Sequence, residues 1–508
     1  MLANTLANYL LIAVWLLTAV FLTRIIYLGL GNTSYGFWGL LWSIFGYSLL
    51  LDFGFGVSVQ KYTSELTVTG DYKTYNALLS TVFTVYFLMV LLIIAATLVL
   101  QFFLGALFEF PEGADMHLYR WTFIWFGIGT ALSFQLGAFT EVLKGLKKIY
   151  LRNVIMLAGQ LVNFAGVWLI FRLGYGLLEL AVFSVSINLL KNLVMALCAY
   201  RLLPGIRIHP RHFDKSLFRY VFSFSLFAYL IMFGNLVIFN TSQLLLGVLL
   251  GVEAVAVYQI GSRLSEMLMR LCTQFQDNLS PIAASLFKAG EVERLQRILL
   301  RSNRLIGLLA FILFLGMTIL ARPVLRLWLH VTDPQAIRVA YLMNVSMFVH
   351  ILFRSGSSQV LLMADKHRLL SVVAVVESAL NIALSVVCIK VFGVIGVTLG
   401  ILIPNVIMSV FVVFPAASRF GGLPVSEYLR KVYLPLILVS APSAAVLLGS
   451  FMIMPADSWN LVALGAVSCV AALIYAILGY FFVLPDEDRL LIHSGLGRVR
   501  SFALGRTP

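Results

Sequence analysis

The chain has 508 residues, of which 61% are hydrophobic and only 11% are charged. A soluble protein of this length could not bury so much apolar surface, so the composition excludes a soluble protein and predicts a chain largely embedded in lipid. The formal net charge is +14, but the basic residues lie mostly in short loops between apolar runs, which indicates membrane topology and not nucleic-acid binding.

Apolar runs of about 20 residues recur along the chain, and this is the length that an α-helix needs to cross a bilayer. The runs are continuous, whereas the strands of a membrane β-barrel alternate. The sequence therefore predicts an all-α polytopic membrane protein with about 14 transmembrane helices. The predicted spans are 6–30, 36–58, 76–105, 118–142, 150–172, 178–202, 218–240, 254–285, 302–325, 338–362, 368–390, 393–417, 431–452 and 460–484.

The loops between these spans differ in charge. One set of alternate loops contains KGLKK (144–148), RIHPRHFDK (207–215) and DKHR (365–368), whereas the opposite side includes the acidic loop FEFPEGAD (108–115). Basic loops stay preferentially in the cytoplasm. We therefore expect both termini on the cytoplasmic side.

The chain also contains a weak internal repeat. A shift of about 220 residues places TGDYKTYNALL (69–79) over AGEVERLQRIL (289–299), in agreement with the span order and loop charge. Six spans per repeat is an even number, so the repeats form two parallel six-helix lobes. The predicted divisions are an N-lobe (1–203), a basic cytoplasmic linker (204–217), a C-lobe (218–418), two further helices (419–485) and a basic cytoplasmic tail (486–508).

Ionisable residues occur inside several predicted spans, where each costs about 3 kcal/mol and usually faces a bundle interior or a water-filled cavity. The bases are Arg24, Lys191, Arg263, Arg270 and Arg354, and the acids are Asp52, Glu141, Glu266, Asp277 and Glu377. Guanidinium and ammonium groups suit an anion, phosphate above all. We predict that the five bases bind substrate. The acids predicted to compensate charge or couple transport to an ion are Asp52, Glu266, Asp277 and Glu377.

The eighth predicted span carries the clearest pattern. Its polar residues recur in steps of four and three, which places them on one helical face. They are Gln259, Arg263, Glu266, Arg270, Thr273 and Asp277. The sequence leaves two interpretations open, a polar cavity lining and an Arg–Glu–Arg ladder that holds two helices together.

The second predicted span ends unusually, in LLDFGFGVSVQKYTSE (50–65). Asp52 can pair with a base in a cavity, carry a coupling proton or lie at the membrane interface. Gly54 and Gly56 either let the helix bend or only allow close packing. Pro281, near the end of the eighth predicted span, is a further predicted hinge or packing residue.

No motif for enzymatic chemistry stands out. The sequence has no GxxxxGK[ST] nucleotide-binding motif and no His/Cys spacing for a metal. Its four cysteines all fall in apolar runs. We therefore expect no catalytic residue, no metal and no cofactor, while proton or sodium coupling stays open.

LLLDFGFGVSVQKYTSEL (49–66) followed by GDYKTYNALLSTVF (70–83) resembles a signature of bacterial polysaccharide flippases. These are O-antigen and exopolysaccharide translocases of the multidrug/oligosaccharidyl-lipid/polysaccharide (MOP) exporter superfamily. In the second lobe, LLGVEAVAVYQIGSRLSEML (249–268) followed by SPIAASLFKAGEVERLQR (280–297) is similarly typical.

The resemblance implies a V-shaped transporter of the bacterial inner membrane, and not an enzyme. Such a protein moves undecaprenyl-pyrophosphate-linked oligosaccharide from the cytoplasmic to the outer leaflet by alternating access through a cationic central cavity. The implied partners are the lipid-linked glycan, membrane lipid and other polysaccharide assembly proteins, without nucleic acid.

Three other functions stay open. A lipid II flippase shares the plan of 14 spans. A multidrug or cation exporter of the same superfamily is expected to have an embedded acid in its first lobe, whereas the first span here carries Arg24 and no acid. A membrane polysaccharide polymerase or acyltransferase is disfavoured because large loops and an embedded His pair are missing.

Overall fold

The structure is a computed structural model, and it describes residues 2–277, 291–363, 366–420, 422, 424–454, 458–486 and 489. Every regular element in this part of the chain is helical. Twelve helical segments among the described residues are long and apolar enough to cross a membrane. The predicted all-α, multi-pass fold is thereby confirmed, while the predicted number of fourteen spans is not.

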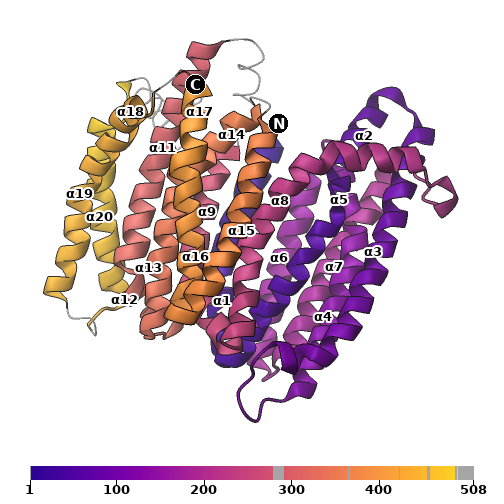
Figure 1. Ribbon diagram of the computed structural model, residues 1–508, viewed down its shortest axis with the longest axis horizontal. Helices are drawn as coiled ribbons and strands as arrows, with labels where there is room; N and C mark the ends of the chain where they lie inside the picture. Colours follow the sequence, from indigo (N-terminus) through magenta and orange to yellow (C-terminus); the bar gives the residue numbers. More distant parts are fainter. Residues whose placement is uncertain are drawn as a thin grey trace, which may run out of the picture. The chain divides into compact units, whose positions relative to one another are not determined.

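The chain divides into two compact units, and unit 1 comprises Met1–Ile260 and His367–Ile401. Its elements are α1 (Leu2–Gly46), the 3₁₀ turn η1 (Tyr47–Asp52), α2 (Phe55–Thr69), α3 (Tyr72–Leu107), α4 (Met116–Leu136), α5 (Ala138–Gly145), α6 (Ile149–Arg172), α7 (Leu177–Leu202), the 3₁₀ turn η2 (Pro210–His212), α8 (Lys215–Leu249), the start of α9 (Val252–Asp277), α15 (His367–Phe392) and most of α16 (Val394–Val406). In Figure 1, α3, α4 and α7 run side by side, and α8 packs along α15.

Unit 2 comprises Gly261–Lys366 and Leu402–Pro508. Besides the rest of α9 and the end of α16, its elements are α11 (Val292–Ile319), α12 (Ala321–Leu329), α13 (Pro334–Val349), the π-helical turn η3 (His350–Ser355), α14 (Gly356–Met363), the π-helical turn η4 (Ile407–Val413), α17 (Phe414–Phe420), α18 (Val425–Tyr428), the π-helical turn η5 (Leu429–Tyr433), α19 (Leu434–Ile453) and α20 (Leu461–Phe482). Helices α19 and α20 pack against each other (Figure 1). The predicted lobes and their boundaries stay a prediction.

Two features account for the difference in span number. The first two predicted spans form one helical segment, because α1 continues through a break at Gly31, where φ is 70° and ψ is 178°. Only glycine adopts such a backbone conformation without steric cost. The eighth predicted span corresponds to α9, which is long enough to cross a bilayer but carries the charged residues of the polar stripe.

Local capping sets the start of several helices. The side chains of Asp71, Asp115 and Asn460 accept hydrogen bonds from backbone N–H groups in the first turns of α3, α4 and α20. Asp214 caps α8 in the same way. Each cap satisfies backbone donors that a helix start leaves without an intrahelical partner.

The segment between α7 and α8 is attached to α3 by side-chain hydrogen bonds. Asn76 Nδ2 donates to the carbonyl of Gly205 (3.0 Å), and Asn76 Oδ1 accepts from the backbone N–H of Arg207 (3.0 Å). Thr81 Oγ1 accepts from the backbone N–H of Asp214 (2.9 Å). This basic linker therefore has a defined path over the N-terminal turns of α3.

Buried apolar side chains join α2, α3, α5 and α7 into one core. Phe55, Leu78, Phe139 and Val142 are almost fully buried in it. This core holds the start of α2 against α5, and it thereby places the two acidic residues Asp52 and Glu141 in one region.

Many large apolar residues lie on the surface instead. Phe102, Leu169 and Phe411 are all exposed. In a multi-pass membrane protein such side chains face lipid, which removes the cost of leaving them uncovered.

Candidate functional site

The backbone changes direction between η1 and α2. Phe53 and Gly54 both adopt left-handed conformations, with φ of 47° and 79°. Glycine tolerates this region, but a bulky residue such as Phe53 pays about 1–3 kcal/mol for it. Phe53 stacks on Tyr229 of α8, with ring centroids 5.4 Å apart. This aromatic contact helps to hold the strained turn.

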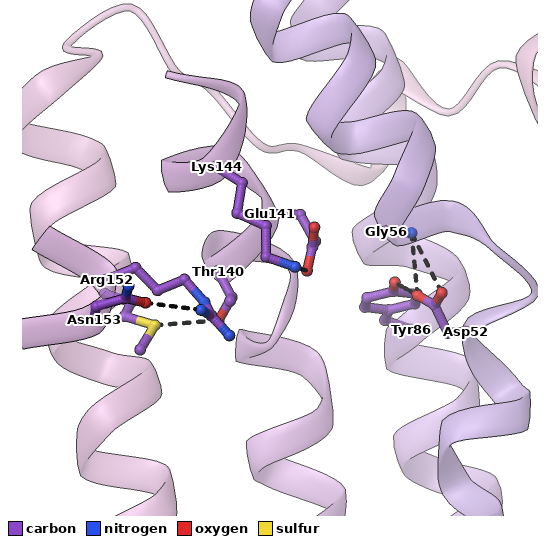
Figure 2. Close-up of polar contacts among 9 residues, drawn as sticks. Asp52, Gly56, Tyr86, Thr140, Glu141, Lys144, Arg152 and Asn153 are labelled. Carbon is purple, nitrogen blue, oxygen red and sulfur yellow. Dashed lines mark hydrogen bonds and ion pairs between the residues drawn. The ribbon is translucent and has the colours of Figure 1, made fainter. Parts of the chain in front are cut away.

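Asp52 lies at the turn and is fixed from two sides (Figure 2). The backbone N–H of Gly56 donates to both carboxylate oxygens, at 3.2 and 3.4 Å. The hydroxyl of Tyr86, on α3, donates to Oδ1. One contact is local and the other spans 34 positions, so Asp52 both satisfies a backbone donor in the first turn of α2 and ties this helix to α3.

Gly56 separates Asp52 from a second acid, Glu141 of α5. A Cβ atom on Gly56 would lie 3.3 Å from Glu141 Cγ and 3.5 Å from both carboxylate oxygens of Asp52. Glu141 forms an ion pair with Lys144, one turn along α5, at 2.6 Å (Figure 2). Glycine at position 56 therefore lets two carboxylates face one space.

That space is a cavity of about 370 Å³ within unit 1. Helices α2 to α5, α7 and α8 contribute to its wall. Its polar lining includes Asp52, Tyr86, Ser133, Glu141, Asn188 and Asn192. The Nδ2 atom of Asn192 donates to the backbone carbonyl of Ser133 at 3.1 Å, which fixes the amide at the wall. Carboxylates, amides and hydroxyls in one cavity can bind a cation or a ligand rich in hydroxyl groups.

The predicted bases are distributed over both units. Arg24 on α1 and Lys191 on α7 belong to unit 1, and both are half-buried. Lys191 packs its aliphatic stem on α6, where a Cβ on Gly159 would lie 2.2 Å from Lys191 Cδ. Arg354 belongs to unit 2 and is buried in η3.

Arg263 and Arg270 lie on the part of α9 that belongs to unit 2. Arg263 Nη1 pairs with Glu266 Oε2 at 2.9 Å, one turn away, and their side chains are 30% and 44% exposed. Arg270 is also exposed and lies within electrostatic reach of Glu266 and Arg263. The stripe is thus an Arg–Glu–Arg group on an accessible face.

The remaining predicted residues lie elsewhere. Glu377 is buried on α15 in unit 1. Asp277 is the last residue of α9, and its side chain is outside the described part of the chain. Pro281 lies outside the described residues altogether.

Sequence reasoning missed most of the cavity's neutral polar residues. Asn188 and Asn192 on α7 are one helical turn apart, and so are Thr130 and Ser133 on α4. Pairs of polar residues at this spacing in apolar helices are a signal for a shared face. The sequence cannot show that the two faces meet Asp52.

Comparison with known proteins adds a family and a fold. Residues 21–330 match the sequence model of a family described as polysaccharide biosynthesis protein. The search of curated proteins gave no match.

Several solved structures resemble most of the chain. The lipid II flippase MurJ in an inward closed conformation has a TM-score of 0.69 at 14% identity, over 95% of this chain and 99% of that one. A multidrug resistance MATE family transporter of the MOP superfamily gives 0.61 at 15% identity in its inward-facing form, over 80% of this chain and 94% of that one. An outward-facing structure of a MATE family transporter gives 0.59 at 15% identity, over 83% and 95%. The fold is therefore that of MurJ and the MATE transporters.

Proposed function

The chain belongs to the polysaccharide biosynthesis protein family, as a membrane transporter with the MOP-superfamily fold, and from this premise we propose that it is a flippase for lipid-linked oligosaccharide. The proposed substrate is an undecaprenyl-pyrophosphate-linked glycan. It moves from the cytoplasmic to the periplasmic leaflet of a bacterial inner membrane, by alternating access.

The observation that carries the proposal is the Arg–Glu–Arg group on α9. Charged side chains in a helix of membrane length are costly unless they face water or an ionic ligand. Arg263 and Glu266 keep 30% and 44% of their side-chain surface exposed, so an incoming ligand can reach them. Guanidinium groups bind phosphate oxygens through two parallel hydrogen bonds, which suits a pyrophosphate.

Glu266 gives this group a way to release its ligand. When the site is empty, Glu266 neutralises Arg263 at 2.9 Å. When pyrophosphate binds, it competes with the carboxylate for the same guanidinium. Glu266 and substrate are then mutually exclusive partners of Arg263, and the empty carrier has one uncompensated positive charge fewer during its return.

The membrane potential favours the transport direction. Outward movement of an anion across a membrane that is negative inside is electrically downhill, by about 2.3 kcal/mol per charge per 100 mV. The return of the empty carrier is then the step that needs charge compensation. Lys191, Arg24 and Arg354 are proposed as further bases along the path, and Asp52, Asp277 and Glu377 as further compensating acids.

Reconstitution in proteoliposomes with a polyprenyl-pyrophosphate glycan tests the proposal. Arg263→Ala and Arg270→Ala should each abolish transport, and the Lys variants should restore only part of it because ammonium lacks the bidentate fork. Arg338→Ala, at an exposed arginine at the start of α13 in the same unit, is the matched control and should transport normally. Normal transport by both Ala variants would refute the role of the stripe.

A cation exporter is a second candidate, because the cavity of unit 1 carries two carboxylates. Such an exporter should confer resistance to cationic compounds, and Asp52→Asn should abolish that resistance. If the chain exports cations and does not move the lipid-linked glycan, this second function replaces the first.

The proposed orientation has both termini in the cytoplasm. It rests on the basic alternate loops. Reporter fusions after residue 112 should read outside, and fusions after residues 146 and 210 should read inside. An outside signal at 146 or 210 would refute the proposed orientation.

A further inference from the structure

We propose that the cavity of unit 1 is a binding site for one non-acidic sugar ring, and that it selects against uronic acids. The inference rests on the proposed function, because the ring would belong to the transported glycan. It names a second ligand site, separate from the pyrophosphate site proposed on α9, and assigns a class of sugar to it.

The size and composition of the cavity suit a pyranose. A volume of about 370 Å³ lies within the range of small-molecule sites. Tyr86 and Phe134 contribute aromatic rings with centroids 4.7 Å apart. Leu49 and Met232 add apolar surface. One part of the wall can therefore contact the C–H face of a sugar, while polar groups remain for its hydroxyls.

Ser133 is an independent sign that a ligand belongs in the cavity. Ser133 is 5% exposed and lines the cavity. Its Oγ atom has no hydrogen-bond partner among the residues that the structure describes. A buried hydroxyl without a partner costs about 1–3 kcal/mol. A hydroxyl of a bound sugar would remove this cost.

Other polar groups keep capacity for a ligand beside Ser133. Asn192 uses Nδ2 to bind the carbonyl of Ser133 at 3.1 Å, which leaves its Oδ1 as an acceptor. Asp52 is held by Gly56 and Tyr86, and Glu141 by Lys144. Each carboxylate has about four lone-pair positions, so both can still accept hydrogen bonds from sugar hydroxyls.

The charge of the wall determines which sugars fit. Asp52 and Glu141 approach the same cavity from either side of Gly56, and Lys144 neutralises one of them. The carboxylate of a uronic acid would be repelled by the remaining negative charge. The cavity therefore selects uncharged sugars over negatively charged ones. A divalent metal is a poor alternative, because the described residues contain no group of three or more His, Cys, Asp or Glu side chains that could hold one.

The test uses the full chain purified in detergent. Methyl glucoside, methyl N-acetylglucosaminide and methyl glucuronide are added at millimolar concentration, with sodium chloride and choline chloride in parallel. Binding is measured by saturation-transfer NMR and by the midpoint of thermal unfolding. We expect the two uncharged glycosides to bind, and the glucuronide to bind at least tenfold more weakly.

Ser133→Ala is the decisive variant. It removes a hydroxyl that has no partner in the described structure, so the unfolding midpoint of the ligand-free protein should not fall. Affinity for the uncharged glycosides should nevertheless fall about tenfold. Ser443→Ala is the matched control, because Ser443 is also buried in a spanning helix but donates to the carbonyl of Ala471 in unit 2 (3.0 Å). It should leave glycoside binding unchanged.

Several results would overturn the inference. The first is that methyl glucuronide binds as tightly as the uncharged glycosides, and the second is that no glycoside binds. The third is that only sodium or choline gives a binding signal, and that Ser133→Ala weakens this signal. If the wild-type chain still moves the lipid-linked glycan in proteoliposomes, such a result refutes the sugar site alone. If glycosides bind but no lipid-linked glycan is moved, the proposed function fails and the cavity remains a sugar site.

Discussion

The carboxylates of the unit 1 cavity and the charged stripe of α9 are built in different ways. Glu266 finds its partner Arg263 three residues away on the same helix, and its side chain stays accessible. Asp52 depends on Tyr86, 34 positions along the chain, and meets Glu141 only because Gly56 leaves room between them. Local pairs follow from the periodicity of a helix, whereas the cavity exists only after the helices of unit 1 have packed.

The cavity of unit 1 depends on helix packing, so it should be sensitive to a larger side chain at its wall. Gly56→Val places a branched side chain where a single Cβ already lies 3.3 Å from Glu141 Cγ. We expect loss of about 1–3 kcal/mol in unfolding free energy and more than tenfold loss of transport in proteoliposomes. Gly465→Val is the control, because nothing lies within 4 Å of the corresponding Cβ position on α20. If both variants lose the same unfolding free energy and transport, the close packing around Gly56 does not matter for the cavity.

The second prediction separates a structural pair on α9 from a substrate site. Exchanging the partners, Arg263→Glu with Glu266→Arg, keeps an intrahelical ion pair but moves the guanidinium by about one turn. A structural ladder would tolerate the exchange. A pyrophosphate site would not, so we expect normal amounts of folded protein and at least tenfold less transport. Glu266→Gln should retain substrate binding but turn over more slowly, and unchanged turnover would contradict the switching role of Glu266.

The contrast between contacts within one helix and contacts between helices also determines what could be predicted from the sequence. The face shared by Arg263, Glu266 and Arg270 follows from periodicity, because helical neighbours are fixed by spacing. The apolar runs and the charge of the loops are likewise read directly from local sequence. The helix end at Asp52 is recognisable as unusual because an acid and two glycines follow an apolar run. Its partner Tyr86 was not, because one tyrosine in an apolar helix carries no mark of the contact it will make.

Two further features of the structure, the break at Gly31 and the cavity of unit 1, were not predicted from the sequence for physical reasons. The break at Gly31 has φ 70° and ψ 178°, yet one glycine in an apolar run does not reveal whether a helix ends or continues in a new direction. The cavity was missed because Asn188 and Ser133 lie on separate helices. Their common wall depends on how α4 packs against α7, and the spacing of residues within one helix contains no such information.

A third prediction measures the long-range contact of Asp52. Tyr86→Phe removes the hydroxyl that donates to Asp52, and it should lower the unfolding free energy by about 1–3 kcal/mol because the acceptor is charged. Tyr475→Phe is a matched control, since Tyr475 is buried in α20 but its hydroxyl has no partner among the described residues. This control should be neutral or slightly stabilising. A similar loss in both variants would mean that ring packing, and not the bond to Asp52, matters.

The smallest effect belongs to a local contact outside the spans, the cap of α8. Asp214 accepts hydrogen bonds from the Ser216 hydroxyl (2.5 Å) and from the backbone N–H groups of Ser216 (2.7 Å) and Leu217 (3.3 Å). The hydroxyl of Ser216 and then these N–H groups lower the pKa of Asp214 below its ordinary value of 3.8. A lowered pKa means that the ionised cap stabilises the fold fully above about pH 3.8, and that this contribution is lost as the pH falls through the folded-state pKa. Asp214→Ala should therefore lower the unfolding midpoint slightly at neutral pH, and the difference from wild type should shrink in acid.

Asp214 also has a long-range tie, because Thr81 accepts from its backbone N–H. Thr81→Val removes that tie without touching the carboxylate, so its effect should not change over the same pH range. If the effect of Asp214→Ala is equally independent of pH, the side-chain cap contributes nothing and the long-range bond alone holds the start of α8.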